Sequence, residues 1–365
     1  MNGIINVYKE AGFTSFDVVA KLRGMLKTKK IGHTGTLDPD AVGVLPICVG
    51  NATKVCDLLM DETKEYIALM HLGLITDTQD MSGEILEDHR DMVASLSDKD
   101  IQDAIMSFVG EIDQVPPMYS ALKVNGQKLC DLARKGIEVE RKSRKVRIDE
   151  IEILEWIEDQ HDVIKCASAA DGEDVASNDV VASDGAKNPS QGLHNEENYV
   201  NNEKLIRFRV VCSKGTYIRT LCHDIGQKLG CGAAMEHLER SRVGSFTKDN
   251  ALTLGQIQEI IDSEKSEADG CCENSYGELR GLHNILMPVD IIFDKYSALH
   301  VNERGEKALK NGNQLQADMI KEVNDNLIML TSRQVYRIYS YDNQFAALYE
   351  YHSGWKVLKT VKMFL

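Results

Sequence analysis

Strand-like and helix-like segments follow one another in this 365-residue chain without the regular alternation that builds a doubly wound sheet. The spacing of apolar residues predicts strands over 64–72, 146–156 and 205–212, and helices over 98–109, 127–135 and 217–229. Thr14 or Ser15 can cap a further helix that follows them. Toward the C-terminus, short apolar runs lie close together and predict a small β-rich domain. The pattern therefore indicates the α+β class.

Charge is distributed unevenly along the chain. The net charge of −15 argues at first against a nucleic-acid partner. However, residues 166–203 carry a net −7 and residues 262–280 a net −4, whereas residues 119–147 carry a net +6. The first acidic segment has almost no large apolar residue, so we expect a flexible insertion at 166–203 and a second acidic loop at 262–280. The basic segment can still meet a polyanion, because local charge sets the field.

Cysteine usage and hydropathy exclude several classes of protein. The nine cysteines include no pair of Cys-x-x-Cys motifs, so structural zinc is not expected. No segment approaches the roughly 18 uncharged apolar residues that a membrane-spanning helix needs. The N-terminus has neither a basic region nor a long apolar run, so no secretory signal is predicted. We expect a cytoplasmic protein without metal.

One glycine-rich stretch, GHTGTLDPDAVGVLPICVGNATK at 32–54, stands out as a candidate for chemistry. Asp38 precedes a proline, which favours an extended backbone. On these residues alone its carboxylate could be a nucleophile, a general base or a turn cap, and His33 could be an ordinary surface residue. The stretch contains no phosphate-binding P-loop, no G-x-G-x-x-G and no G-x-S-x-G.

This stretch resembles the catalytic motif of the TruB family of tRNA pseudouridine synthases, with Asp38 at the family's aspartate. Three further segments match the family in the same order. They are Lys64-Glu65-Tyr66 with Leu72-Gly73; the segment 117–123 (PMYSALK) with Gly126 and 133–136 (ARKG); and the segment 213–220 (SKGTYIRT) with Asp224, Gly226 and Leu229-Gly230. The likeness covers about residues 3–250, apart from the insertion.

The resemblance implies a fold and a reaction. The fold would be a pseudouridine-synthase catalytic domain over 1–288, with a mixed, largely antiparallel sheet flanked by helices, and a β-rich PUA-like domain over 289–365. The reaction would isomerise uridine 55 in the T loop of tRNA. The N1–C1′ bond breaks, the uracil turns, and C5 bonds to C1′. This chemistry needs no cofactor and no metal, and the expected partner is the T arm of tRNA, bound by a monomer without any membrane.

The resemblance also implies the catalytic residues. Asp38 would be the essential carboxylate, which could attack C1′, add elsewhere or assist sugar deprotonation. Arg219 would pair with Asp38 and keep its carboxylate ionised. Tyr66 would lie against the target base and could act as a general base. Without the family, Arg219 would be read as a surface charge and Tyr66 as a core aromatic.

Binding of the RNA requires a base to leave its stack, which costs a few kcal/mol. By resemblance, His33 would fill the space that the flipped base vacates, and Tyr217 would contact the target uracil. Phosphate contacts are expected from basic side chains, among them Lys64, Lys123, Lys128 and Arg134. The chain departs from the family at Cys130, where an aromatic is usual, and at Glu239, where a basic residue is usual.

Two other functions remain open from the sequence. An RNA-binding protein that opens and refolds the T arm would not need Asp38, Tyr66 and Arg219 for product formation. A small-molecule glycosidase would use a carboxylate on free uridine. The basic segment at 119–147 disfavours the glycosidase, because a nucleoside does not need an extended positive surface.

Overall fold

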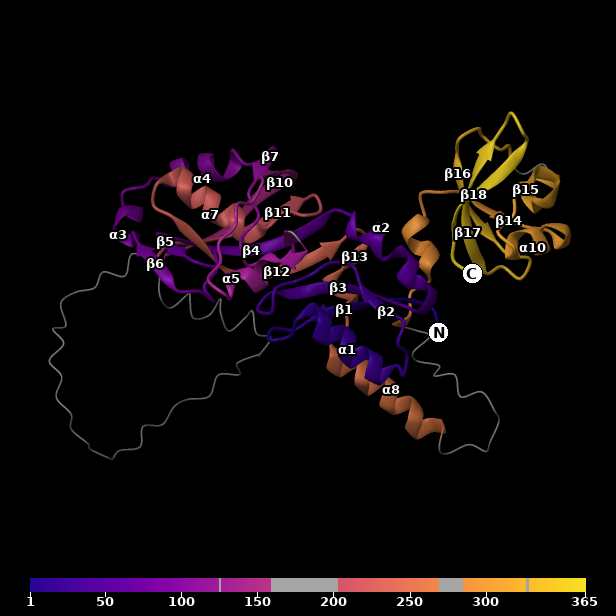
Figure 1. Ribbon diagram of the computed structural model, residues 1–365, viewed down its shortest axis with the longest axis horizontal. Helices are drawn as coiled ribbons and strands as arrows, with labels where there is room; N and C mark the ends of the chain where they lie inside the picture. The colour runs from indigo at the N-terminus through magenta and orange to yellow at the C-terminus, as the bar shows by residue number, and fades with distance from the viewer. Residues whose placement is uncertain (125, 159–202, 269–284, 326–327) are drawn as a thin grey trace. The chain divides into compact units, whose positions relative to one another are not determined.

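The chain forms two compact units in the computed structural model (Figure 1). The first unit comprises Met1–Glu62 and Arg242–Leu365, and the second comprises Thr63–Ser241. The predicted domain boundary at 288 falls inside the first unit and stays a prediction. The structure describes residues 1–124, 126–158, 203–268, 285–325 and 328–365.

The N-terminal part of the first unit is built around strand β3, in which all eight residues are buried. Strands β1 and β2 both pair with it in antiparallel fashion. Helices α1 and α8 lie side by side (Figure 1) and share an apolar core with β1 and β3. The elements are β1 (Gly3–Lys9), α1 (Ser15–Met25), β2 (Ile31–His33), β3 (Val42–Val49), the 3₁₀ helix η1 (Gly50–Val55), α2 (Cys56–Met60), β13 (Phe246–Thr247), η2 (Lys248–Asn250) and α8 (Leu254–Ala268).

The C-terminal part of the first unit is rich in β structure, as predicted. Five strands form a sheet in the order β14-β16-β17-β18-β15, in which only the β14–β16 pairing is parallel among the described residues. Its elements are η3 (Val289–Phe293), β14 (Ala298–His300), α10 (Glu303–Lys310), β15 (Leu315–Gln316), η4 (Ala317–Met319), α11 (Lys321–Asn324), β16 (Val335–Tyr339), β17 (Phe345–His352) and β18 (Val357–Met363).

The second unit contains a sheet in the order β12-β4-β11-β10-β7, with helices α4 and α7 packed against each other (Figure 1). The β4–β11, β11–β10 and β10–β7 pairings are antiparallel. Its elements are β4 (Lys64–Leu72), β5 (Leu74–Thr76), β6 (Ile85–Asp88), α3 (Arg90–Val93), α4 (Asp98–Met106), β7 (Gly110–Gln114), β8 (Lys123–Val124), β9 (Gln127–Lys128), α5 (Leu129–Ala133), β10 (Arg144–Ile157), β11 (Leu205–Cys212), α7 (Ile218–Leu229) and β12 (Ala233–Val243), which ends in the first unit. These sheets and helices confirm the α+β class.

Three details differ from the sequence-based expectations. The glycine-rich stretch contains a strand that was not predicted, β3 at residues 42–49. Helix α8 continues through Ala268, so residues 262–268 are helical and do not belong to an acidic loop. Helix α4 ends at Met106, and Gly110, with φ of 116°, begins strand β7 instead of closing the helix. Except for Glu203, the predicted insertion at 166–203 lies outside the described residues, as does 269–280.

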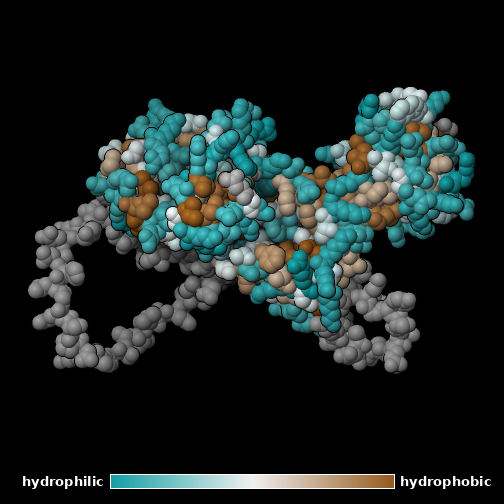
Figure 2. All heavy atoms as spheres, in the orientation of Figure 1, coloured by the Kyte–Doolittle hydropathy of each residue, from teal (hydrophilic) through white to brown (hydrophobic). Residues whose placement is uncertain are grey.

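On the face that Figure 2 presents, hydrophilic side chains predominate and hydrophobic ones form small separate patches. Within the described ranges, no helix has both the length and the apolar character needed to cross a bilayer.

Candidate active site

The loop between β2 and β3 carries Asp38, whose side chain is half-buried. Leu37, the residue before it, is 3% exposed. The Leu37 N–H donates to Ser15 Oγ at 2.9 Å, and the Ser15 hydroxyl donates to Leu37 O at 3.3 Å. Ser15 begins helix α1, which is fixed by a capping box between Thr14 and Asp17. Helix α1 therefore anchors the loop on the N-terminal side of Asp38.

Lys9 anchors the same loop on the other side of Asp38. This lysine ends strand β1 and is fully buried. Its Nζ donates to three backbone carbonyls, those of Glu10 at 3.0 Å, Phe13 at 2.7 Å and Pro39 at 2.8 Å. The Gly12 N–H also donates to Pro39 O, at 3.0 Å. A buried ammonium needs such partners, and here they fix the backbone that follows Asp38. The sequence analysis missed Lys9, although a charged residue that ends an apolar strand was a visible signal.

We expect Lys9→Met to lower the free energy of unfolding by about 2–4 kcal/mol, because buried carbonyls left without a donor cost about 1–3 kcal/mol each. Methionine has a similar length but cannot donate a hydrogen bond. Urea denaturation followed by circular dichroism measures the effect, with Lys29→Met at an exposed position of the same unit as the control. Equal stability of Lys9→Met and the parent would contradict the anchoring role.

His33 lies at the end of β2, opposite Ile47 of β3. Its ring is half-buried, and its Nδ1 accepts a hydrogen bond from the Gly35 N–H at 3.3 Å. With Nδ1 as the acceptor, the neutral imidazole carries its proton on Nε2. His33 and Asp38 are thus held at opposite ends of one short, anchored segment of the first unit.

Tyr66 and Lys64 lie in the second unit, on strand β4. They are two residues apart and so face the same side of the strand. Both are buried, with exposures of 8% for Tyr66 and 6% for Lys64. In its burial Lys64 differs from Lys123, Lys128 and Arg134, the exposed basic residues predicted with it.

Arg219, the second residue of α7, is 5% exposed and held by several acceptors. Its Nη1 donates to Thr78 O at 3.3 Å and to Asp80 Oδ2 at 3.2 Å, and its Nη2 donates to Tyr119 O at 2.7 Å. Arg219 is therefore not the surface charge that its place in the first turn of a helix suggests without the family resemblance. The segments of Thr78 and Tyr119 are far from α7 in sequence, and they meet at this guanidinium.

Asp80, which was not predicted from the sequence, is the carboxylate partner of Arg219. While its Oδ2 accepts from Arg219, its Oδ1 accepts from the Thr78 hydroxyl at 2.7 Å and from the Ser82 N–H at 3.1 Å. These bonds fix the carboxylate, which in turn orients Arg219. The predicted pairing of Arg219 with Asp38 joins residues of different units and stays a prediction, as does the meeting of Asp38 with Tyr66.

The remaining predicted residues fall into two groups. Tyr217 is half-buried and occupies the N-cap position of α7. Lys123, Lys128 and Arg134 are exposed in the segment of β8, β9 and α5. Lys123 and Lys128 are directly opposite each other in the β8–β9 hairpin. Like charges in that position repel each other, and a bound anion would relieve the repulsion.

Burial shifts the pKa of two groups near the residues described above. Burial raises the pKa of Cys212, which is paired in register with Lys64, to about 12, although the Lys64 charge acts in the opposite direction. Burial also raises the pKa of Asp224 in α7 to about 6. At neutral pH the thiol is therefore protonated, whereas the Asp224 carboxyl is mostly ionised.

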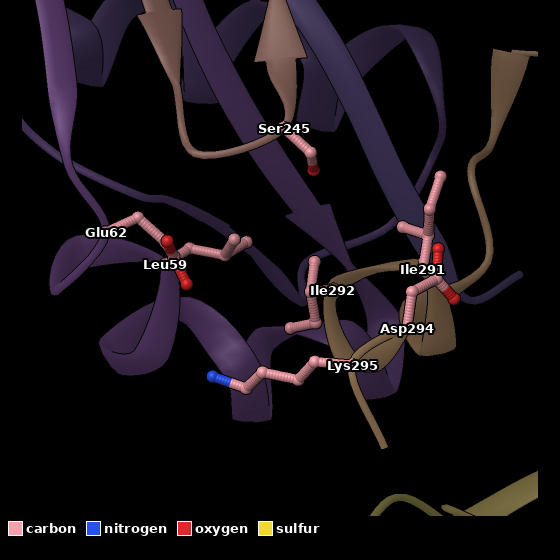
Figure 3. Close-up of a pocket in the computed structure, with 7 residues that line it drawn as sticks. All are labelled: Leu59, Glu62, Ser245, Ile291, Ile292, Asp294 and Lys295. Atoms are coloured by element: carbon pink, nitrogen blue, oxygen red, sulfur yellow. The ribbon is translucent and has the colours of Figure 1, made fainter. Parts of the chain in front are cut away.

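A pocket of about 220 Å³ lies elsewhere in the first unit, between α2, the β12–β13 turn and η3 (Figure 3). The charged side chains that it contains are two acids and one lysine. It is lined by Leu59, Glu62, Ser245, Ile291, Ile292, Asp294 and Lys295. None of the nine predicted site residues lines this pocket, so we assign it no role in the proposed reaction.

Comparison with known proteins confirms the resemblance. Residues 23–170 match the model of the TruB family pseudouridylate synthase (N terminal domain), and residues 219–294 match that of the tRNA pseudouridylate synthase B C-terminal domain. In solved structures the fold is similar to that of an H/ACA RNP bound to a substrate RNA containing 2′-deoxyuridine, with a TM-score of 0.60 and 23% identity over 100% of this chain and 85% of that chain. At this identity the likeness concerns the fold alone.

Curated relatives match the chain over its whole length. A tRNA pseudouridine synthase B from Lachnoclostridium phytofermentans is 44% identical over 100% of both chains. A protein of the same name from Clostridium tetani is 36% identical over 98% of this chain and 99% of its own. The chain therefore belongs to the TruB family of tRNA pseudouridine synthases, isomerases that convert uridine in tRNA to pseudouridine.

Proposed function

We propose that this protein converts uridine 55 in the T loop of tRNA to pseudouridine and that Asp38 is the essential carboxylate. One observation carries the proposal: the backbone is anchored on both sides of Asp38, by Ser15 before it and by Lys9 after it. A carboxylate on such a loop has a fixed position, as a group that acts on the sugar requires.

The second unit supplies Arg219, Tyr66 and Tyr217 to the proposed site, and the first unit supplies His33. Arg219, oriented by Asp80, would pair with the Asp38 carboxylate and keep it ionised. Tyr66 and Tyr217 would lie against the uracil while the N1–C1′ bond breaks and the C5–C1′ bond forms. The C5 proton is lost in the last step, and Tyr66 is the candidate to accept it. His33 would occupy the space that the flipped base leaves in the T loop.

The substrate also requires a surface for the phosphates. The β8–β9 hairpin presents Lys123 and Lys128 opposite each other, and Arg134 follows in the next helix. These exposed charges in an acidic protein favour RNA over a nucleoside as the substrate. Cofactor-free chemistry, a monomeric state and a cytoplasmic location stay predictions.

Release of tritium from C5 tests the proposed reaction. A T-arm stem-loop labelled at C5 of its uridines is incubated with the protein, and the same label is offered as free uridine. We expect one tritium per RNA to be released from the stem-loop and none from the nucleoside. Cleavage of free uridine to uracil that keeps its C5 tritium would favour a glycosidase, and RNA binding without release would favour a protein that only refolds the T arm.

We propose a second RNA contact at the β17–β18 turn, in the part of the chain that the resemblance assigns to a PUA-like domain. Trp355 is 66% exposed, and the Lys359 Nζ lies 3.3 Å from the centroid of its indole ring. The His352 ring stacks against the same indole, at 5.9 Å between centroids. An aromatic ring beside cations is the kind of surface that binds unpaired bases and phosphates.

We expect Trp355→Ala to weaken the binding of full-length tRNA about tenfold, since one stacked base contributes about 1–3 kcal/mol. Binding of the isolated T-arm stem-loop should not change, because this RNA lacks the nucleotides that the second contact would hold. Filter binding with both RNAs measures the difference. Tyr341→Ala, which removes another exposed aromatic beside a lysine, is the control. An unchanged Kd for full-length tRNA would contradict this contact.

A further inference from the structure

Gln114 makes an unusual pair of hydrogen bonds. It is the last residue of β7 and is only 1% exposed. Its Nε2 donates to Tyr217 O at 3.0 Å, and its Oε1 accepts from the Tyr217 N–H at 2.8 Å. A single side chain thus binds both backbone polar groups of one residue. The backbone N–H can only donate and the carbonyl can only accept, which fixes the orientation of the amide.

Tyr217 is the point at which α7 begins. As the N-cap residue it has extended dihedral angles, and its side chain makes no capping hydrogen bond. Its carbonyl accepts the first helical bond, from the Leu221 N–H at 3.0 Å, in addition to the bond from Gln114. The Gln114 amide therefore holds the residue that determines where the first turn of α7 lies. That turn carries Arg219.

Gln114 is also close in sequence to the acceptor on the other side of the arginine site. Strand β7 pairs with β10, and Gln114 is opposite Arg144 in this register. Five residues after Gln114, the carbonyl of Tyr119 accepts the Nη2 bond from Arg219. The segment that leads to the Tyr119 carbonyl and the helix that carries Arg219 are therefore linked through the buried amide of Gln114.

We infer that Gln114 is a positioning residue for the reaction: its amide sets the backbone of Tyr217 and, through the rigid first turn of α7, the place of the Arg219 guanidinium. This inference rests on the proposed function, since it assigns Tyr217 and Arg219 to the site. Gln114 itself does not touch the reacting atoms. Loss of the Gln114 amide would displace Tyr217 and Arg219, which belong to the proposed site. A displacement of about 1 Å can lower a rate on the order of 100-fold.

Two substitutions test this role through different chemistry. Gln114→Leu removes both hydrogen bonds at similar volume. Gln114→Glu keeps the acceptor for the Tyr217 N–H, but the ionised carboxylate faces the Tyr217 carbonyl without a proton to donate. When protonated, the glutamic acid restores the donor, and burial raises its pKa. The activity of Gln114→Glu relative to the parent should therefore rise as the pH falls from about 8 to about 6, whereas that of Gln114→Leu should not.

The experiment measures kcat by tritium release, the Kd for tRNA by filter binding, and the melting temperature. We expect kcat to fall about 10- to 100-fold at pH 8 in both variants, with Kd within about twofold of the parent. Asn6→Leu is the matched control. Asn6 is also a buried amide, 2% exposed, and it donates to a distant carbonyl, Thr247 O, at 2.8 Å. That variant should lose stability but keep its kcat.

Several results would overturn the inference. A folded Gln114→Leu variant with the kcat of the parent would show that Gln114 has only a structural role. A loss confined to Kd would assign it to RNA binding. Equal pH profiles for Gln114→Glu and Gln114→Leu would contradict the donor argument. If the parent itself released no tritium, the proposed function would fail in the same assay, and that failure is distinguishable because it does not depend on residue 114.

Discussion

Asp38→Asn is expected to lower the single-turnover rate of pseudouridine formation by at least about 10⁴-fold, which corresponds to about 5 kcal/mol of transition-state stabilisation. Asparagine has nearly the same volume but carries no negative charge and is a poor nucleophile. The loop should keep its place, because Ser15 and Lys9 hold the backbone of Leu37 and Pro39 on either side of Asp38. Tritium release with enzyme in excess measures the rate.

A matched control lies in the same loop. Asp40 is exposed and two residues from Asp38, so Asp40→Asn makes the same chemical change without touching the proposed carboxylate. Its rate should remain within about twofold of the parent. Both variants should bind the T-arm RNA as the parent does. A rate for Asp38→Asn within about tenfold of the parent, with RNA binding retained, would exclude an essential role.

Asp80→Asn is expected to lower the rate on the order of 100-fold, because a hydrogen bond to a charged group contributes about 1.5–3 kcal/mol. The amide can still accept from Thr78 and Ser82, so the turn should persist. However, its NH₂ group then faces the Arg219 Nη1, donor against donor. The buried guanidinium would lose its carboxylate and shift toward other acceptors.

The second prediction has its own control and readout. Asp88→Asn breaks a different aspartate–arginine pair in the same unit, between Asp88 and the partly exposed Arg90, at 2.7 Å. Surface pairs contribute at most about 1 kcal/mol, so that variant should retain its rate. Single-turnover tritium release compares the two at saturating enzyme. If Asp80→Asn and Asp88→Asn had equal rates, Asp80 would not orient a catalytic group.

Elements with strong local signals could be predicted from the sequence. The strands at 64–72 and 205–212 match the structure at both ends. Helix α1 begins after Thr14, as its capping residues suggested. Strand β3 was missed, because all its residues are buried and it shows no alternation, while Gly43 and Pro46 suggested a loop. The helix expected over 127–135 is shorter, because residues 127 and 128 pair in the β8–β9 hairpin.

The candidate site was predictable only where residues form a motif. Asp38, Tyr66 and Arg219 could be proposed because they stand in segments that resemble the family. Asp80 and Gln114 were not predicted, because their roles depend on contacts between distant positions. The Gln114 amide meets a residue 103 positions away, and Asp80 meets an arginine 139 positions away. Apolar periodicity and local spacing carry no information on such pairs.

The central claim is tested most directly by locating pseudouridine in an unmodified tRNA transcript after incubation with the parent protein. Carbodiimide modification followed by primer extension identifies the position at nucleotide resolution. The account predicts pseudouridine at uridine 55 and its absence when the transcript carries cytidine there. Pseudouridine at another position, with uridine 55 unchanged, would contradict the proposed function.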